Sequence, residues 1–383
     1  MRRVCVVVTA RPSYSRIKTV LDAVNAHPEL ELQLVVAASA LLDRYGSVVE
    51  QIEADGFTID TYVYMVLEGE SPIIMAKTTG IGIMELSTAF HNLRPDVVVT
   101  VADRYETMAT AVAAAYSNIP LAHIQGGEVT GSIDEKVRHA VTKLADLHFV
   151  ATDVAGRRVL RMGEADDRVF VTGCPSIDIA AQMTETQQLS FDPFTRYGGV
   201  GDLLDLGHGY IVVMQHPVTT EHHHARLHVE QTLDAVSQTR LPALWFWPNV
   251  DAGSDGTSNG LRAFREQNPS APIHFFKNMA PLDFLELLAC SNAIVGNSSV
   301  AIREGSFLGV PAVNVGSRQR NRERAENVID VDYDAAAIAD AIRGQLDHGH
   351  YTTSTLYGDG KACVRIADHL ASAALTFDKQ LAY

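Results

Sequence analysis

Short apolar runs alternate along the first half of this chain with segments whose apolar residues recur at a helical period. The runs are rich in valine, isoleucine and leucine and only a few residues long, as expected of buried strands. They occupy residues 4–9, 32–37, 97–101, 121–124, 149–151 and 169–172. The helical pattern covers residues 15–26, 74–92, 105–117, 133–145 and 154–162. This alternation predicts a parallel sheet covered by helices on both faces, the doubly wound α/β arrangement.

The same alternation starts again after a polar, glycine-rich break at residues 187–209. Strand-like runs then occupy residues 210–214, 244–247, 273–276, 293–296 and 312–315. We therefore expect two Rossmann-like domains, at residues 1–180 and 181–357, with a ligand-binding cleft between them. The pattern at residues 358–382 is helical, and we expect the segment 358–383 to pack back on the first domain.

Composition narrows the class of partner. With 383 residues the chain exceeds the usual size of one domain, and 46% apolar with 20% charged residues is typical of a globular protein. The net charge of −15 argues against nucleic acid or an anionic membrane as a partner, but leaves room for a small phosphorylated ligand. No apolar run is long enough to span a bilayer, and the four separated cysteines form no CxxC pair. We expect a cytoplasmic protein.

Carboxylates follow two strands of the first predicted sheet. Asp103 comes directly after one strand, and Glu128 and Asp134 flank a turn that begins with two glycines after the next. Open α/β sheets bind ligands at the carboxyl ends of their strands, and clustered carboxylates repel, which can raise one pKa enough for acid catalysis. Two simpler interpretations stay open. Asp103 could be a helix N-cap, and Asp134 with Arg138 an ordinary i,i+4 surface pair.

Other strand ends carry residues suited to a phosphate. Arg11 and Ser15 lie where the first helix begins, and a helix N-terminus with arginine and serine favours anion binding. A capped helix with solvated arginines is the alternative. His216 follows the first strand of the second half, where it could donate to a phosphate, act as an acid, or simply bond to backbone.

Two further loops of the second half have residues suited to binding a diphosphate. Ser298 and Ser299 open a helix, so free N–H groups there could cradle phosphates, and Glu304 could accept from ribose hydroxyls. Serine caps are common, so either serine alone could be structural. Arg318 begins the main basic cluster, which lies after a strand.

Two other polar segments are less specific. Asn249 lies in a polar loop after an aromatic strand, where it could contact a ligand or only form a turn. The run His222-His223-His224 is more typical of a solvated helix start than of a metal site, because neighbouring residues on a helix point in different directions.

Ordered blocks along nearly the whole chain resemble the hydrolysing UDP-N-acetylglucosamine 2-epimerases. The blocks are TARPSYSRIKTVL, HIQGGEVTGSIDEKVRHAVTKLADLHF, TGCPSID, QHPVTTE and GNSSVAIREGSFLGVPAVNVGSRQRNRERAENV. The resemblance implies a GT-B-like fold and elimination of UDP from UDP-N-acetylglucosamine across C1 and C2. Hydration of the resulting 2-acetamidoglucal then gives N-acetylmannosamine. It implies no cofactor and no metal, in agreement with the missing dinucleotide fingerprint, and a homodimer or homotetramer.

The resemblance also assigns roles to residues at matching positions. Asp103, Glu128 and Asp134 match the catalytic carboxylates, of which one must take the C2 proton and one must handle protons at hydration. His216 and Arg138 match positions that contact or help expel the diphosphate. The predicted substrate and nucleotide contacts are Arg11, Ser15, Arg104, Asn249, Ser298, Ser299, Glu304 and Arg318.

Some positions depart from the family pattern. Ala102 stands where glycine usually precedes the first catalytic aspartate, Pro12-Ser13 replaces Ala-Asp after Arg11, and Leu282 stands where an aromatic residue is expected. These departures leave open the same chemistry on a UDP- or GDP-linked 2,4-diacetamido-2,4,6-trideoxy sugar. A non-hydrolysing 2-epimerase, a GT-B glycosyltransferase and a catalytically silent sugar-nucleotide-binding protein are further alternatives.

Overall fold

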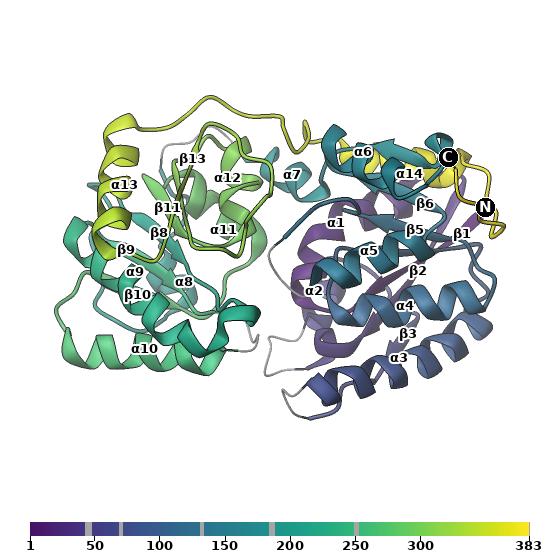
Figure 1. Cartoon of the computed structure of the whole chain (residues 1–383), viewed down its shortest axis with the longest axis horizontal. Helices are drawn as coiled ribbons and strands as arrows, with labels where there is room; N and C mark the ends of the chain where they lie inside the picture. The colour runs from purple at the N-terminus through teal and green to yellow at the C-terminus, as the bar shows by residue number, and fades with distance from the viewer. Residues whose placement is uncertain (43–47, 69–71, 131–133, 184–187, 249–252, 383) are drawn as a thin grey trace. The chain divides into compact units, whose positions relative to one another are not determined.

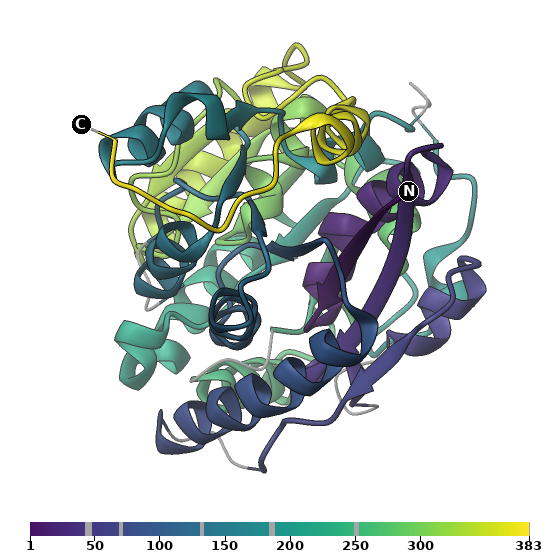
Figure 2. The same cartoon turned by 90° about the vertical axis from the view of Figure 1, so that its right-hand side faces the viewer.

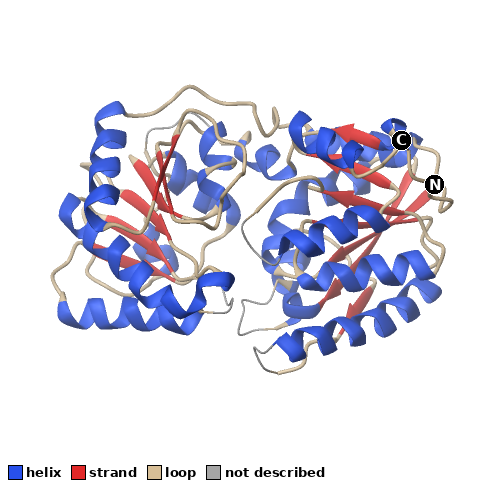
Figure 3. Ribbon diagram, in the orientation of Figure 1, coloured by secondary structure: helices blue, strands red, loops and turns tan. Residues whose placement is uncertain are grey.

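The chain divides into two compact units, each with its own parallel sheet between helices (Figures 1 and 3). The computed structural model describes residues 1–42, 48–68, 72–130, 134–183, 188–248 and 253–382. The first unit comprises Met1–Glu128, Asp134–Asp178 and Tyr357–Tyr383, and the second comprises Val129–Ile133 and Ile179–Leu356.

The first unit holds a seven-stranded sheet of order β3-β2-β1-β4-β5-β6-β7. Its strands are β1 (Arg2–Val8), β2 (Leu30–Ala37), β3 (Thr61–Val63), β4 (Val97–Val101), β5 (Leu121–Ile124), β6 (Leu147–Val150) and β7 (Val169–Val171). The helices around it are α1 (Arg11–Ala26), α2 (Val49–Ala54), α3 (Pro72–Leu93), α4 (Tyr105–Tyr116), α5 (Asp134–Leu144), α6 (Asp153–Arg161) and α14 (Ala362–Ser372), and α7 (Pro175–Ala180) follows β7.

The second unit holds a six-stranded sheet of order β10-β9-β8-β11-β12-β13. Its strands are β8 (Ile211–Met214), β9 (Ala243–Phe246), β10 (Ile273–Phe276), β11 (Ala293–Gly296), β12 (Ala312–Val315) and β13 (Val328–Val331). Its helices are α8 (Pro193–Tyr197), α9 (Ala225–Thr239), α10 (Ser254–Gln267), α11 (Pro281–Ala289), α12 (Glu304–Phe307) and α13 (Ala335–His348), with short 3-10 turns η4 (Thr219–His224) and η5 (Ser299–Ala301).

Both sheets reverse their strand order at one place. In the first unit β1 pairs with β2 on one side and β4 on the other, and in the second β8 pairs with β9 and β11 in the same way. The chain therefore leaves these neighbouring strands toward opposite faces, which opens a crevice at their carboxyl ends where such sheets bind ligands. The residues just after β1, β4, β8 and β11 are placed there by topology alone.

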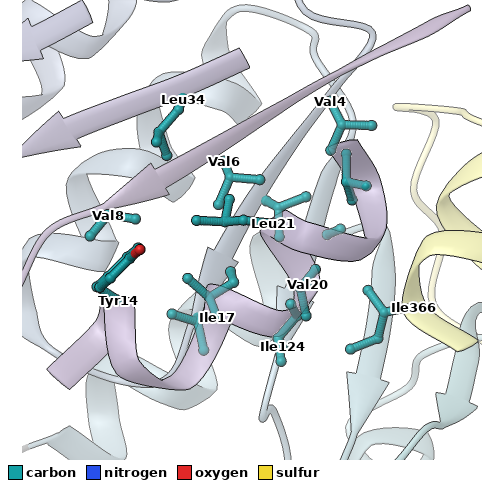
Figure 4. Packing of buried hydrophobic residues seen from close by; sticks show 14 of the residues in the cluster. Val4, Val6, Val8, Tyr14, Ile17, Val20, Leu21, Leu34, Ile124 and Ile366 are labelled. Atoms are coloured by element: carbon teal, nitrogen blue, oxygen red, sulfur yellow. The ribbon is translucent and has the colours of Figure 1, made fainter. Parts of the chain in front are cut away.

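The first sheet is buried on both faces, which explains its continuous apolar runs. In β1, Val4, Val6 and Val8 pack with residues such as Ile17 of α1 and Ile366 of α14 (Figure 4). The alternate residues of the strand belong to a second cluster on the opposite face. Because a strand's side chains alternate, one apolar run supplies both cores.

The structure differs from the predicted elements at the edges of the sheets and at the C-terminus. The edge strands β3 and β13 were not predicted, because they are short and partly exposed: Tyr62 is 42% and Ile329 39% exposed. The helix predicted at 358–382 is limited to α14. The backbone of the residues beyond it pairs with other segments instead, as in the bond from the Ala382 N–H to the Gly163 carbonyl at 2.9 Å.

No helix within the described ranges has both the length and the apolar character that a bilayer crossing requires.

An ionic cluster around the buried Glu164 links the C-terminal segment beyond α14 to the rest of the first unit. Figure 2 shows this segment in yellow. The Glu164 carboxylate accepts from His148 Nε2 at 3.0 Å and from Lys143 and Lys379 at 2.5 Å each. Burial raises the pKa of Glu164, but the three hydrogen bonds outweigh burial and hold that pKa at about 2. Removing this carboxylate would leave His148, Lys143 and Lys379 without the acceptor that they share.

We expect Glu164→Gln to lower the free energy of unfolding at pH 7 by about 3 kcal/mol, because it removes the buried carboxylate that compensates the Lys143 and Lys379 ammonium groups. The folded-state pKa of Glu164 lies below its ordinary value of 4.5, so the wild-type advantage is complete above that value. It is lost as pH falls from about 4.5 toward about 2. Denaturant unfolding across this pH range tests the prediction.

Asp359→Asn is the matched control. Asp359 pairs with Arg365 at 2.6 Å, but both side chains are more than 40% exposed. An exposed pair contributes about 1 kcal/mol or less. Equal losses in the two variants would contradict the special role of the buried cluster.

Candidate active site

Two backbone positions with positive φ shape the carboxyl edge of the first sheet. Ala102 and Gln125 directly follow β4 and β5 and have φ of 66° and 67°. His123 holds the two strand ends together, because its Nε2 lies 2.9 Å from the Ala102 carbonyl and its Nδ1 3.2 Å from Thr142 Oγ1 of α5. Burial lowers the pKa of His123 to about 4, so the ring is neutral, with its proton on Nε2 facing the carbonyl.

Asp103 forms a buried ion pair with Arg138 of α5. Their side chains are 14% and 3% exposed. Arg138 also donates from Nη1 to the Glu128 carbonyl at 2.9 Å and lies 3.8 Å from the Glu135 carboxylate. One guanidinium therefore connects the end of β4, the loop after β5 and the first turns of α5. Such charge-assisted bonds are among the stronger ones in proteins.

This geometry excludes the helix-cap interpretation of Asp103. The residue that caps α4 is Arg104, and no side chain caps the helix N-terminus there. Asp103 is thus not the cap, and its carboxylate faces Arg138 instead. Arg138, which the family resemblance links to the diphosphate, contacts the first predicted catalytic carboxylate in this structure.

Glu128 is 5% exposed and ends the glycine turn after β5. Gly127 has φ of 72°, and a Cβ there would lie 2.3 Å from the Ala155 carbonyl of α6, so the turn requires glycine. The structure thus brings the Glu128 backbone into contact with the Asp103–Arg138 pair. Asp134 is the first residue of α5, and its side chain lies outside the described residues.

The other predicted contacts of the first unit lie at the same edge. Arg11 begins α1, and burial lowers its pKa. The Ser15 hydroxyl donates back to the Arg11 carbonyl at 3.3 Å. Arg104 approaches the carboxylate of Glu106 through Nε and Nη2, at 3.3 and 3.4 Å. The sequence analysis did not single out Glu106, which is fully buried, because its two-residue spacing from Arg104 predicts no contact.

His216 anchors the carboxyl edge of the second sheet. Its backbone N–H donates to Asn297 Oδ1 at 2.8 Å, and the residue is 4% exposed. Burial, and secondly the charge of Arg318, lower the pKa of His216 to about 3. At neutral pH the ring is therefore uncharged and suited to donate one hydrogen bond. Arg318 follows β12 and supplies a fixed positive charge beside it.

The side chains of Ser298 and Ser299 form hydrogen bonds within the turn after β11. Ser298 caps η5 by accepting from the Val300 N–H at 3.4 Å, and Ser299 Oγ accepts from Arg303 Nη2 at 2.9 Å. Glu304 opens α12 and is 7% exposed. The structural interpretation of Ser298 as a cap is thus correct, and a cap does not prevent its backbone from meeting an anion.

Three other features singled out in the sequence add little to the candidate site. Asn249 lies outside the described residues. His222, His223 and His224 lie in η4, and within the described ranges there is no group of three His, Cys, Asp or Glu residues that could hold a metal ion. Leu282 lies in the first turn of α11 and is 44% exposed.

Several known proteins match this chain over nearly its whole length. The family described as UDP-N-acetylglucosamine 2-epimerase matches residues 22–371. A UDP-N,N'-diacetylbacillosamine 2-epimerase (hydrolyzing) of Legionella pneumophila is 33% identical over 365 residues, which cover 95% of this chain and 94% of that protein. A UDP-N-acetylglucosamine 2-epimerase of Neisseria meningitidis is 29% identical over 366 residues, which cover 94% and 92%.

Solved structures share the fold. The crystal structure of UDP-GlcNAc 2-epimerase from Neisseria meningitidis bound to UDP-GlcNAc matches with a TM-score of 0.78 and 19% identity, over 96% of this chain and 99% of that one. This likeness confirms the predicted fold class of two doubly wound parallel-sheet domains with GT-B-like architecture.

The strained residue before Asp103 gives a stability prediction. Left-handed backbone costs an alanine about 1–2 kcal/mol, whereas glycine adopts it freely but loses about 0.5–1 kcal/mol in chain entropy. We therefore expect Ala102→Gly to raise the free energy of unfolding by about 0.5 kcal/mol in urea titrations.

Gly127→Ala is the opposite control, because its Cβ would meet backbone 2.3 Å away. It should destabilise the protein by more than about 2 kcal/mol. A destabilised Ala102→Gly variant would contradict the strain at Ala102.

Proposed function

Because this chain belongs to the UDP-N-acetylglucosamine 2-epimerase family, we propose that it is a hydrolysing 2-epimerase that converts UDP-N-acetylglucosamine to N-acetylmannosamine and UDP. The observation that carries this proposal is the buried Asp103–Arg138 pair beside Glu128, at the crevice where a doubly wound sheet binds its ligand. The hydrolysing type is supported by the activity for which the Legionella pneumophila relative is named.

The first step we propose is an elimination. A carboxylate takes the proton from C2 of the sugar, the C1–O bond to UDP breaks, and the electron pair of the C2–H bond forms the C1=C2 double bond. We assign proton removal to Asp103, because contact with the Arg138 guanidinium fixes its position and pairs it as the anion. UDP leaves with the electron pair of the C1–O bond.

The second step we propose is hydration of the 2-acetamidoglucal. A carboxyl group returns a proton to C2 on the opposite face, while a second carboxylate takes a proton from the water that attacks C1. Glu128 and Asp134 are the remaining candidates for these two roles. A buried carboxyl such as Glu128, only 5% exposed, is shielded from bulk water, which suits proton transfer to carbon.

The second unit supplies the groups we assign to the diphosphate. Arg318 provides the charge that offsets the negative charge on departing UDP, and neutral His216 provides an N–H donor. The backbone at Ser298 and Ser299 adds donors, and Glu304 is suited to ribose hydroxyls. Pre-arranged donors of this kind favour the leaving group at the moment when its charge develops.

A second candidate substrate is a UDP-linked 2,4-diacetamido-2,4,6-trideoxy sugar with the same chemistry. The activity for which the Legionella pneumophila relative is named favours this substrate, and so does the departure at Leu282. Purified protein should be given each nucleotide sugar separately, with free UDP and free sugar measured by chromatography. The substrate with the higher kcat/KM is the assigned one, and release of neither UDP nor sugar from both would overturn the proposed function.

We expect Asp103→Asn to lower kcat by 10²- to 10⁴-fold, because an amide cannot accept the C2 proton. UDP affinity should stay within a few-fold of wild type, since asparagine leaves Arg138 in place and the other groups assigned to the diphosphate are not altered. Steady-state kinetics and calorimetric titration with UDP measure the two effects.

Asp146→Asn is the matched control. Asp146 accepts the Leu121 N–H at 2.9 Å at the start of β5, the edge of the same sheet opposite to Asp103. Its loss should affect stability and leave kcat unchanged. An Asp103→Asn enzyme with normal kcat would remove Asp103 from the mechanism.

A further inference from the structure

The backbone pairing between β8 and β11 stops where the site begins. The two strands pair in register from Ala293↔Ile211 to Gly296↔Met214, and the Asn297 N–H then donates to the Met214 carbonyl at 3.0 Å. Gly296 has φ of 127°, and a Cβ there would lie 2.2 Å from that carbonyl. The chain therefore turns away from β8, and the backbone pairing between the two strands does not extend to His216.

The Asn297 side chain continues the ladder in place of the backbone. Its Oδ1 accepts the His216 N–H at 2.8 Å, and its Nδ2 donates to the His216 carbonyl at 2.8 Å. A carboxamide has the donor and acceptor of a peptide group, so it can pair with both polar groups of one extended residue. Asn297 is fully buried, and only this orientation of the amide gives two favourable bonds.

The main chain of Asn297 fastens a third strand end. Its carbonyl accepts from Arg318 Nη1 at 3.2 Å and from Gln319 Nε2 at 2.9 Å. Both donors come from the loop after β12. One residue thus joins the segments after β8, β11 and β12, and each of those segments carries a group assigned to the diphosphate.

We propose that Asn297 is a positioning residue that fixes His216 and Arg318 relative to the backbone donors at Ser298 and Ser299. Its amide oxygen and nitrogen are both engaged with His216, so it acts through its neighbours. This inference rests on the proposed function, because it assumes that these groups meet a nucleoside diphosphate. Displacing a positioned donor by about 1 Å can cost about 10²-fold in rate.

The test compares three variants with wild type by calorimetric titration with UDP at pH 5, 6, 7 and 8. Asn297→Ala removes both bonds, and we expect UDP affinity and kcat/KM to fall by about 10²-fold at every pH. Asn297→Asp keeps the acceptor for the His216 N–H but turns its second oxygen toward the His216 carbonyl. Protonation of that oxygen restores the donor, so the variant's loss of affinity relative to wild type should shrink as pH falls.

Several groups act on the pKa of the new carboxyl. Burial and the facing His216 carbonyl raise that pKa, whereas the His216 N–H, the nearby Arg318 guanidinium and the Tyr333 hydroxyl lower it. We expect burial and the facing carbonyl to outweigh the others, so that recovery begins toward the low end of the pH range tested. A residue that only stabilised the fold would give no such recovery. Taking each affinity relative to wild type at the same pH removes the titration of UDP itself.

Asn292→Ala is the control. The Asn292 side chain also bonds to backbone, since its Oδ1 accepts the Tyr210 N–H at 2.8 Å, but Asn292 lies at the amino end of β11, whereas Asn297 lies at the carboxyl end. It should lower the melting temperature and leave UDP affinity unchanged. Thermal melts establish that each variant is folded, and Asn297→Ser replaces any variant that is not.

The outcomes separate the two proposals. Wild-type affinity and kcat/KM in folded Asn297→Ala or Asn297→Ser would overturn the positioning role alone. A loss in Asn297→Asp that does not change with pH would also overturn it. A wild-type protein that binds no UDP would overturn the proposed function, and the positioning role with it.

Discussion

The candidate chemistry of the first unit depends on one buried ion pair. Arg138 is 2% exposed and contacts the Asp103 carboxylate and the Glu128 carbonyl, so the end of β4, the loop after β5 and α5 meet at one guanidinium. Burying such a pair is costly unless both charges are fully bonded, and breaking it would leave an uncompensated charge. That cost is consistent with a site selected for position and charge rather than for stability.

The supporting structure around this pair is a set of local constraints at strand ends. His123, neutral and buried, bonds to the Ala102 carbonyl, and so fixes the backbone that delivers Asp103. Gly127 allows the loop after β5 to pass against α6. In the second unit, the Asn297 carboxamide fixes the backbone of His216 in a similar way, through hydrogen bonds to its N–H and carbonyl. In both units a buried polar side chain that bonds to backbone orders the residue that we assign to the ligand.

The sequence predicted the fold class because strands buried on both faces read as continuous apolar runs. It failed at the edge strands β3 and β13, where partial exposure breaks the run: Asp330 interrupts the second of them. The sites after β4 and β8 were predictable from topology, since polar residues after neighbouring parallel strands share one edge. The partner of Arg138 was not, because sequence spacing favours an i,i+4 neighbour, whereas tertiary folding brings Asp103 to it. Glu106 and Asn297 were missed for the same reason: their role is visible only through what they contact.

Proton removal at C2 by a fixed carboxylate, coupled to loss of UDP, is the central claim. It is tested most directly by following wild-type protein with UDP-N-acetylglucosamine in D₂O by ¹H and ³¹P NMR. The account predicts free UDP together with N-acetylmannosamine that carries deuterium at C2. Product that retains protium at C2, or an epimerised sugar that stays attached to UDP, would contradict it.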